Sequence, residues 1–430
     1  MPAPARPRCG PWSSNLSPAE RTLAKAAGGL ALALAALLLL AGPGLAHAGV
    51  ATADPPGGVL VEAPPRVTLT FSEPVTPVGR GVAVWSPSGR QVATNLTQPG
   101  AAVLVAQVDA RERGTYLVVW RVIASDTHPS RGSYTFSVGT AGPPPEVGGL
   151  PTGDVGAVSP LGLLLQVLGR WLHLGGYALA FGALAFAVFA LGEAPGSPAE
   201  RACRRLSVAG IVILVLAEPV MLVAQALSLG ALDGQVVAAI LASPSGRILA
   251  LRLGAALLLW ALLGAALESR RRVAWIGCLA LGVALAFVDA AASHGTRAIP
   301  AALGLVLNAA HELAMAGWLG GFAALVAVLR LAAAADRRPL LARFGRLAAV
   351  STAVLVLTGA LLAIAHLRSP LDLLTSTYGV VVAIKVVGVA GALLAAFLGL
   401  RAGRSWRAEA AGMAGVLALA GLLVSLPPPR

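Results

Sequence analysis

Histidine is the commonest metal ligand among protein side chains, and this chain has only six histidines in 430 residues. Two of them, His47 and His128, lie in a segment rich in β-forming residues. The other four lie in or beside long apolar runs: His173, His294, His311 and His366. So restricted a distribution predicts a set of metal ligands that is shared between a soluble segment and a membrane segment.

The composition is typical of a membrane protein. Hydrophobic residues make up 57% of the chain and charged residues 12%, and the mean hydropathy is +0.79. Soluble domains are about 45–50% apolar and about 25% charged. The net charge of +13 comes largely from arginines in the gaps between apolar spans, where they are expected to orient the chain in a membrane. It therefore requires no nucleic acid partner. Cys9, Cys203 and Cys278 form no Cys-x-x-Cys motif, which argues against cysteine-based metal binding.

The N-terminus is typical of an export signal. Arg21 and Lys25 precede the apolar run 29–41, and small residues follow that run. Cleavage after Ala46 would leave His47 at the new N-terminus, whereas cleavage after Ala48 would discard this histidine. Residues 1–46 are therefore expected to be a signal peptide, with both cleavage points open.

Residues 47–139 are expected to form an all-β domain. Five stretches are rich in β-forming residues and are separated by turns, at 67–71, 82–85, 103–105, 116–122 and 134–138. Several short strands over about ninety residues predict a small antiparallel sandwich. Residues 140–160, which contain three consecutive prolines, are expected to be a semi-extended linker.

Residues 161–426 are expected to form an all-α membrane domain of about eight helices, because about 20 apolar residues cross a bilayer. The apolar spans are 161–191, 206–229, 247–267, 273–292, 302–333, 345–367, 379–400 and 408–426. Arginines concentrate in alternate gaps, at 201–205, 270–272, 337–346 and 401–407. The positive-inside rule puts these gaps in the cytoplasm and the β domain on the extracytoplasmic side of the cell membrane.

Three motifs of the β segment resemble the CopC family of periplasmic copper-binding proteins. They are residues 71–75 (Phe-Ser-Glu-Pro-Val), 125–129 (Ser-Asp-Thr-His-Pro) and 132–136 (Gly-Ser-Tyr-Thr-Phe). The resemblance implies a cupredoxin-like or immunoglobulin-like sandwich that binds Cu(II), with ligands that correspond here to His47, His128, Asp126 and Glu73.

The chemistry of these residues suits the implied site. An N-terminal His47 would chelate through its amine and its ring, and the ring of His128 would add a third nitrogen to the tetragonal plane that Cu(II) favours. The alternative is that His128 is an exposed loop residue and Asp126 a turn residue. Because the sandwich segment has no methionine, a soluble Cu(I) site is not expected there.

The apolar segment resembles the CopD family at residues 171–175 (Trp-Leu-His-Leu-Gly), 293–295 (Ser-His-Gly) and 311–313 (His-Glu-Leu). This resemblance implies copper transfer across the cytoplasmic membrane. The expected path contains the four membrane histidines together with Glu312 and Met315. Met315 lies one helical turn after His311, and its thioether would suit Cu(I), although packing is the alternative role.

Further ionisable residues lie inside the apolar spans, where such residues mark functional sites by default: Glu218, Arg252, Asp289 and Lys385. The alternative is that some of them form ion pairs that hold the bundle together, for instance Glu218 with Arg252.

These observations predict a copper-binding membrane protein, not an enzyme, that captures Cu(II) outside the membrane and passes copper through a histidine-containing bundle for import, homeostasis or resistance. The sequence has no Gly-Lys-Ser/Thr phosphate loop, so no nucleotide is expected. Expected partners are copper, lipid and a copper chaperone or reductant. Two alternatives stay open. One is a b-type haem electron-transfer protein or metalloreductase, with haem held by paired histidines. The other is sequestration or oxidase assembly outside the membrane, without transport.

Overall fold

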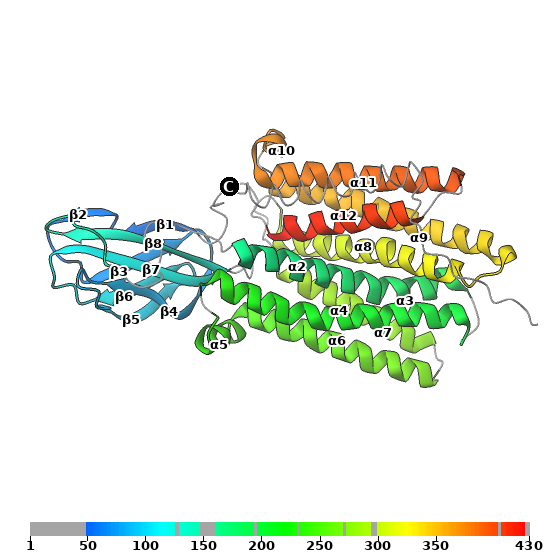
Figure 1. Cartoon of the computed structure of the whole chain (residues 1–430), viewed down its shortest axis with the longest axis horizontal. Helices are drawn as coiled ribbons and strands as arrows, with labels where there is room; N and C mark the ends of the chain where they lie inside the picture. The colour runs from blue at the N-terminus through cyan, green and yellow to red at the C-terminus, as the bar shows by residue number, and fades with distance from the viewer. Residues whose placement is uncertain are drawn as a thin grey trace, which may run out of the picture.

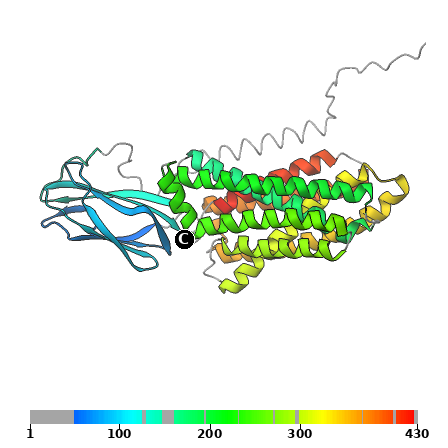
Figure 2. The same cartoon turned by 90° about the horizontal axis from the view of Figure 1, so that it is seen from below.

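The chain folds into a β-sandwich followed by a bundle of long helices (Figure 1). The computed structural model describes residues 49–124, 129–146, 160–192, 196–230, 232–269, 272–293, 299–367, 369–402 and 406–425. The sandwich lies at one end of the bundle in two views at right angles (Figures 1 and 2). This architecture confirms the expected all-β domain followed by an all-α membrane domain.

Eight strands form the sandwich: β1 (Val50–Asp54), β2 (Gly58–Leu60), β3 (Arg66–Phe71), β4 (Val75–Trp85), β5 (Ala93–Gly100), β6 (Val103–Val108), β7 (Gly114–Ala124) and β8 (Pro129–Val138). They pair into two four-stranded sheets, with the orders β1-β3-β6-β5 and β2-β8-β7-β4. Alternate side chains of both sheets meet in one core, in which Leu69, Leu104 and Tyr116 are fully buried. The rings of Tyr116 and Phe136 stack there with centroids 5.1 Å apart.

The five strand stretches expected from the sequence lie within β3, β4, β6, β7 and β8. Strands β1, β2 and β5 were not expected. All three lie at sheet edges, where a strand borders on solvent and tolerates polar residues. Their sequences therefore lack the apolar alternation that reveals a buried strand.

The bundle contains nine α-helices longer than one turn among the described residues: α2 (Pro160–Tyr177), α4 (Pro198–Ser228), α5 (Gly234–Ala242), α6 (Pro244–Ser269), α7 (Arg272–Ala291), α8 (Ala301–Leu329), α9 (Ala334–His366), α11 (Thr377–Ala402) and α12 (Trp406–Ser425). The π-helix η1 (Ala178–Gly182), helix α3 (Ala183–Phe186) and the π-helix η2 (Ala187–Leu191) continue α2 without a break. The single turn α10 (Asp372–Thr375) precedes α11.

Seven helical segments among the described residues are long and apolar enough to cross a membrane. They coincide with the first seven expected spans. The eighth expected span, 408–426, corresponds to α12, whose apolar part Gly412–Ser425 is shorter than the other seven. Seven full-length candidate spans thus lie among the described residues, and α12 occupies the place of the eighth expected span.

The helices alternate in direction along the bundle (Figure 1). The connections after α4, α7 and α9 lie at the sandwich end, where the short helices α5 and α10 also lie. The other connections lie at the opposite end. Exposed arginines of that opposite end include Arg201, Arg205, Arg337 and Arg338. Two of the arginine-rich gaps of the sequence, 201–205 and 337–346, thus lie at the end of the bundle that is remote from the sandwich.

The sandwich packs directly on the bundle. Val78 of β4 and Ile123 of β7 form one buried hydrophobic cluster with Leu229, which follows α4, and Ile240 of α5. Gly230, with a φ of +84°, lies against the guanidinium of Arg131 of β8, so a side chain at this position would displace the arginine. These contacts fix which end of the sandwich faces the helices.

Candidate metal centre

A cluster of buried charged side chains joins four helices in the middle of the bundle. His173 of α2 lies between two carboxylates: its Nδ1 is 3.1 Å from Oε1 of Glu218 on α4, and its Nε2 is 2.9 Å from Oδ2 of Asp289 on α7. The Nε atom of Arg252 on α6 donates a hydrogen bond to Oδ1 of Asp289 at 2.6 Å. The exposed fractions of these four side chains lie between 5% and 14%, so the network is shielded from solvent and lipid.

The hydrogen-bonding pattern links the protonation of His173 to that of the two carboxylates. A carboxylate only accepts hydrogen bonds, so with both carboxylates ionised each ring nitrogen of His173 must donate a proton. The imidazolium and the guanidinium of Arg252 then balance Glu218 and Asp289. Such a balance is what allows four charged groups to be buried together, because an unpaired charge in a membrane interior costs several kcal/mol.

Glu312 of α8 extends the cluster and gives it a metal-binding geometry. His173, Asp289 and Glu312 each offer one ligand atom, and the three atoms lie within 4.8 Å of one another. Oε1 of Glu312 and Oε2 of Glu218 are buried without a hydrogen-bond partner among the described residues. Buried acceptor atoms in this state favour a bound cation. One imidazole nitrogen with carboxylate oxygens is a donor set that suits Cu(II) or Zn(II) better than the softer Cu(I).

A metal at this position would compete with the hydrogen bond between His173 and Asp289. Nε2 of His173 can coordinate a metal only after it loses its proton, and the metal would then take the place of that proton between the ring and the carboxylate. Glu218 would keep accepting from Nδ1, which is the usual way in which a carboxylate orients a ligating histidine.

A seam of polar side chains leads from this cluster toward the sandwich. The side-chain amide of Gln166 on α2 donates to Ser228 on α4 at 3.2 Å. Gln225 of α4 and Ser245 of α6 exchange two hydrogen bonds, of 2.7 and 2.9 Å. The Oε1 atom of Gln166 is buried without a partner among the described residues.

On three helices, a residue of the seam and a residue of the cluster lie on the same helix face, because a fixed number of residues separates them. On α2, α4 and α6 the pairs Gln166 and His173, Glu218 and Gln225, and Ser245 and Arg252 are each seven residues apart. Seven residues are about two helical turns, so the members of each pair lie on one face. The seam ends beside Leu229, which contacts the sandwich.

The other expected residues of the membrane path lie apart from this cluster. His311 of α8 points to α9, where its Nδ1 is 2.9 Å from Oγ1 of Thr358. The Thr358 hydroxyl donates to the carbonyl of Val354 at 2.7 Å, so it accepts from Nδ1–H, and the lone pair of His311 is on Nε2. Met315 is buried in a hydrophobic cluster with Tyr177.

His366 is the last residue of α9, at the sandwich end. Its Nδ1–H donates to the carbonyl of Leu362 at 2.7 Å, which leaves the lone pair of this ring also on Nε2. Among the described residues, the group with metal-binding geometry thus contains His173 and Glu312 but not His311 or His366. His294 lies outside the described residues.

The expected ligands of the sandwich are His47, Asp126, His128 and Glu73, and only Glu73 lies within the described residues. Its neighbour Ser72 donates from its backbone N–H to the carbonyl of Gly49 at 2.9 Å, and the N–H of Gly49 donates to Oγ of Ser72 at 3.2 Å. Val75, two residues after Glu73, pairs with Ala124 at the end of β7. Three chain segments that carry or border expected ligands therefore meet at one end of the sandwich, the end at which Ile123 packs on the bundle.

Sequence reasoning identified Glu218, Arg252 and Asp289 as buried ionisable residues but did not assign them to the metal path. The structure pairs Arg252 with Asp289, rather than with Glu218 as suggested, because Glu218 accepts from His173. The seven-residue spacings on α2, α4 and α6 were a signal that could have revealed the shared faces. The partnership with α7 and α8 could not be derived from spacing, because it depends on how separate helices pack.

Two family models match separate parts of the chain. A family model described as "CopC domain" matches residues 50–139, and one described as "Copper resistance protein D-like, N-terminal domain" matches residues 161–302. Copper resistance protein C of Escherichia coli is 31% identical over 104 residues, which are 22% of this chain and 82% of that protein. Protein YobA of Escherichia coli strain K12 is 34% identical over 98 residues, 22% of this chain and 79% of YobA.

Among solved structures, that of PcoC, a methionine-rich copper resistance protein from Escherichia coli, is 31% identical and has a TM-score of 0.19. The match covers 22% of this chain and 99% of PcoC. With the fold, the two matched domains and the relatives in agreement, this chain belongs to the copper resistance CopC/CopD family, with a CopC domain fused ahead of a CopD-like membrane domain.

Proposed function

We propose that this protein captures Cu(II) on the extracytoplasmic side of the cytoplasmic membrane and passes copper into its helical bundle, for import or for copper homeostasis and resistance. The observation that carries the proposal is the buried group of His173, Asp289 and Glu312 in a bundle on which a CopC domain is docked. Copper is the cargo here, so the protein acts as a carrier rather than as an enzyme.

The first binding site is proposed in the sandwich, with His47, His128, Asp126 and Glu73 as ligands of Cu(II). Its support is the meeting of Gly49, Glu73 and Ala124 at one end of the fold. Copper captured there would be released beside α4, because the same end of the sandwich packs on the bundle.

The polar seam is the proposed way from the sandwich to the buried cluster. Amide and hydroxyl oxygens of Gln166, Ser228, Gln225 and Ser245 can replace part of the hydration shell of a cupric ion at a depth where water is scarce. His173 lies 13 residues after the start of α2, a depth of about 20 Å. An ion that follows the seam would therefore reach a nitrogen donor at His173.

The other residues expected in the membrane path are proposed as further copper ligands. His294 and His366 are candidate ligands near the sandwich end, and His311, adjacent to Glu312 on α8, is the candidate ligand beyond the cluster. Met315 would favour Cu(I), and a Cu(I) step would need a reductant from outside this chain. The orientation rests on the arginine-rich end of the bundle, which the positive-inside rule assigns to the cytoplasm.

Copper flux into liposomes tests the proposal. The full-length protein is reconstituted in liposomes that hold a copper chelator, and entry of radioactive copper is measured. We expect flux in the wild type, a reduction of about tenfold in Glu312→Gln, which replaces one carboxyl group of the cluster with an amide, and no change in Asp336→Asn, an exposed carboxylate remote from it.

Each alternative has its own outcome in the same experiment. Wild-type flux no greater than in protein-free liposomes, with copper still bound, would favour sequestration or oxidase assembly without transport. A Soret absorption band in the purified protein, without bound copper, would favour the haem protein. Among the described residues, His173 gives no support to a haem site, because both of its ring nitrogens face carboxylates and neither is directed at an open position for iron.

A further inference from the structure

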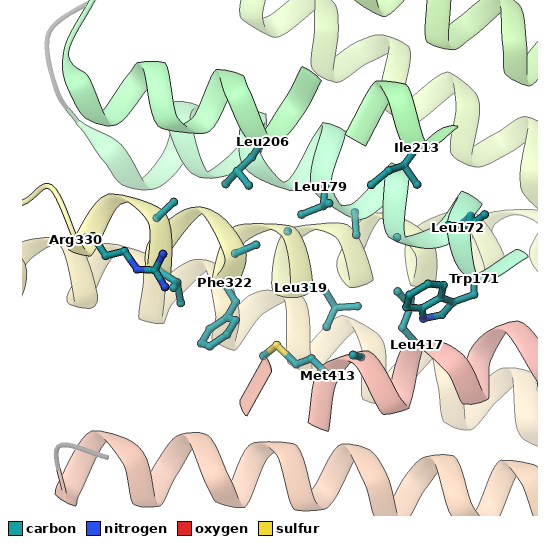
Figure 3. A pocket seen from close by; sticks show the side chains of 17 residues that line it. Trp171, Leu172, Leu179, Leu206, Ile213, Leu319, Phe322, Arg330, Met413 and Leu417 are labelled. Atoms are coloured by element: carbon teal, nitrogen blue, oxygen red, sulfur yellow. The ribbon is translucent and has the colours of Figure 1, made fainter. Parts of the chain in front are cut away.

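A groove runs along the membrane-facing side of the bundle, separate from the charged cluster (Figure 3). Its floor is formed by α2, η1 and α8, and its walls by α4 and α12, which supply Leu206 and Met413 among others. The cavity volume is about 490 Å³. Most of the lining side chains are half-buried, so the groove is open on one side.

Small residues make the groove hollow. Gly320, Ala323 and Ala327 form a strip along α8 at intervals of three and four residues, which is one face of the helix. Larger side chains at these positions would fill the space between α4 and α12. In a membrane such a space is filled by hydrocarbon, because an empty one would forfeit the dispersion contacts of its walls.

The lining is apolar except at its two ends. Of the 17 lining residues, only Trp171 and Arg330 have side chains that can form hydrogen bonds, and Figure 3 shows them at opposite ends of the groove. Along α8 the groove extends from Leu319 to Arg330, a distance of about 16 Å. These features match an unbranched acyl chain with a polar group at one end.

The charge at the Arg330 end selects the polar group. Arg330 is the C-cap residue of α8 and is exposed at the end of the bundle that also presents Arg201, Arg205 and Arg337. A guanidinium forms paired hydrogen bonds with a phosphate, and basic pockets between membrane helices on the cytoplasmic side bind anionic lipid headgroups. A zwitterionic headgroup would add a cationic amine to this positive region.

We propose that the groove binds one anionic phospholipid of the inner leaflet, with an acyl chain along α8 and the phosphate on Arg330. The lipid would bridge α4 and α12, which face each other across the groove and which α2 and α8 connect. The site is independent of copper and is distinct from the path described above.

Native mass spectrometry of the full-length protein in detergent tests this proposal. The protein is titrated with phosphatidylglycerol or with phosphatidylcholine, and bound lipids are counted. We expect the wild type to bind one phosphatidylglycerol about tenfold more tightly than phosphatidylcholine, and Arg330→Ala to lose that preference. Arg337→Ala, which removes an exposed arginine outside the groove, should keep it.

A second variant tests the groove itself. Ala327→Trp fills the space while it leaves Arg330 in place, so the binding of both lipids should fall. Equal affinity of the wild type for the two lipids, or the same behaviour of Arg330→Ala and Arg337→Ala, would overturn the proposal. If Ala327→Trp does not fold, the comparison of Arg330→Ala with Arg337→Ala still tests whether Arg330 binds the lipid phosphate.

Discussion

The Asp289→Asn substitution examines the buried cluster most sharply, because Asp289 accepts from Arg252 at 2.6 Å and faces Nε2 of His173 at 2.9 Å. Asparagine keeps the size of the side chain but removes the charge, so that Arg252 and His173 lose the carboxylate that both of them contact. Removal of one partner from a buried ion pair costs about 3–5 kcal/mol. Since Arg252 is 14% exposed and keeps some contact with its surroundings, we expect the lower end of this range.

The expected destabilisation of about 3 kcal/mol corresponds to a decrease in Tm of about 5 °C, because the entropy of unfolding grows with the length of the bundle. Thermal unfolding of the detergent-solubilised protein measures it. Arg252→Met and the double variant complete a double-mutant cycle, in which we expect a coupling free energy of about 1–3 kcal/mol between Arg252 and Asp289.

Copper analysis of the same variants separates stability from metal binding. Arginine offers no lone pair to a metal, so Arg252→Met should keep the copper of the bundle, while Asp289→Asn and the double variant should lose it. A decrease in Tm below about 2 °C for Asp289→Asn, or additive effects in the cycle, would refute the buried ion pair. Copper binding that survives in the double variant would refute Asp289 as a ligand.

The sandwich supports two further predictions. His128→Ala should weaken Cu(II) binding to the sandwich about tenfold or more, because it removes one of the few nitrogen donors. A competition titration with a Cu(II) chelator measures the change, and an unchanged affinity would exclude this histidine as a ligand. Hydrogen bonds from Arg90 and Ser88 lower the pKa of Glu112 from 4.5 to about 2, so its stabilising contribution is present above pH 4.5 and is lost as the pH falls toward 2. Glu112→Gln should therefore be less stable than the wild type at pH 6 but equally stable near pH 2 when unfolding is followed by tryptophan fluorescence, and a difference that does not depend on pH would contradict this assignment.

The sequence was sufficient to predict the architecture because buried strands and helices have apolar residues in a regular pattern. Strands β3, β6, β7 and β8 alternate or concentrate apolar residues, and the seven apolar helices have the length that a bilayer requires. Strands β1, β2 and β5 lack this pattern, because strands at the edge of a sheet bury few side chains. The short helices α5 and α10 were also missed, since both lie in connections outside the long apolar spans.

The candidate metal centre was predictable only in part. The histidines and the buried acids stand out against an apolar background, and His173 and Glu312 belong to the group with metal-binding geometry. Which of them meet depends on the rotation of each helix about its axis. Adjacent residues of α8 illustrate the difficulty: Glu312 faces Asp289, whereas His311 faces Thr358 of α9.

Pulsed electron paramagnetic resonance on the full-length protein, with the sandwich site removed by His47→Ala and His128→Ala together, shows whether the bundle binds copper through His173 and carboxylates. We expect one remaining Cu(II) with a single imidazole nitrogen, whose signal is lost in His173→Asn and retained in His311→Asn. A bundle without Cu(II), or a nitrogen signal that survives His173→Asn, would contradict this expectation.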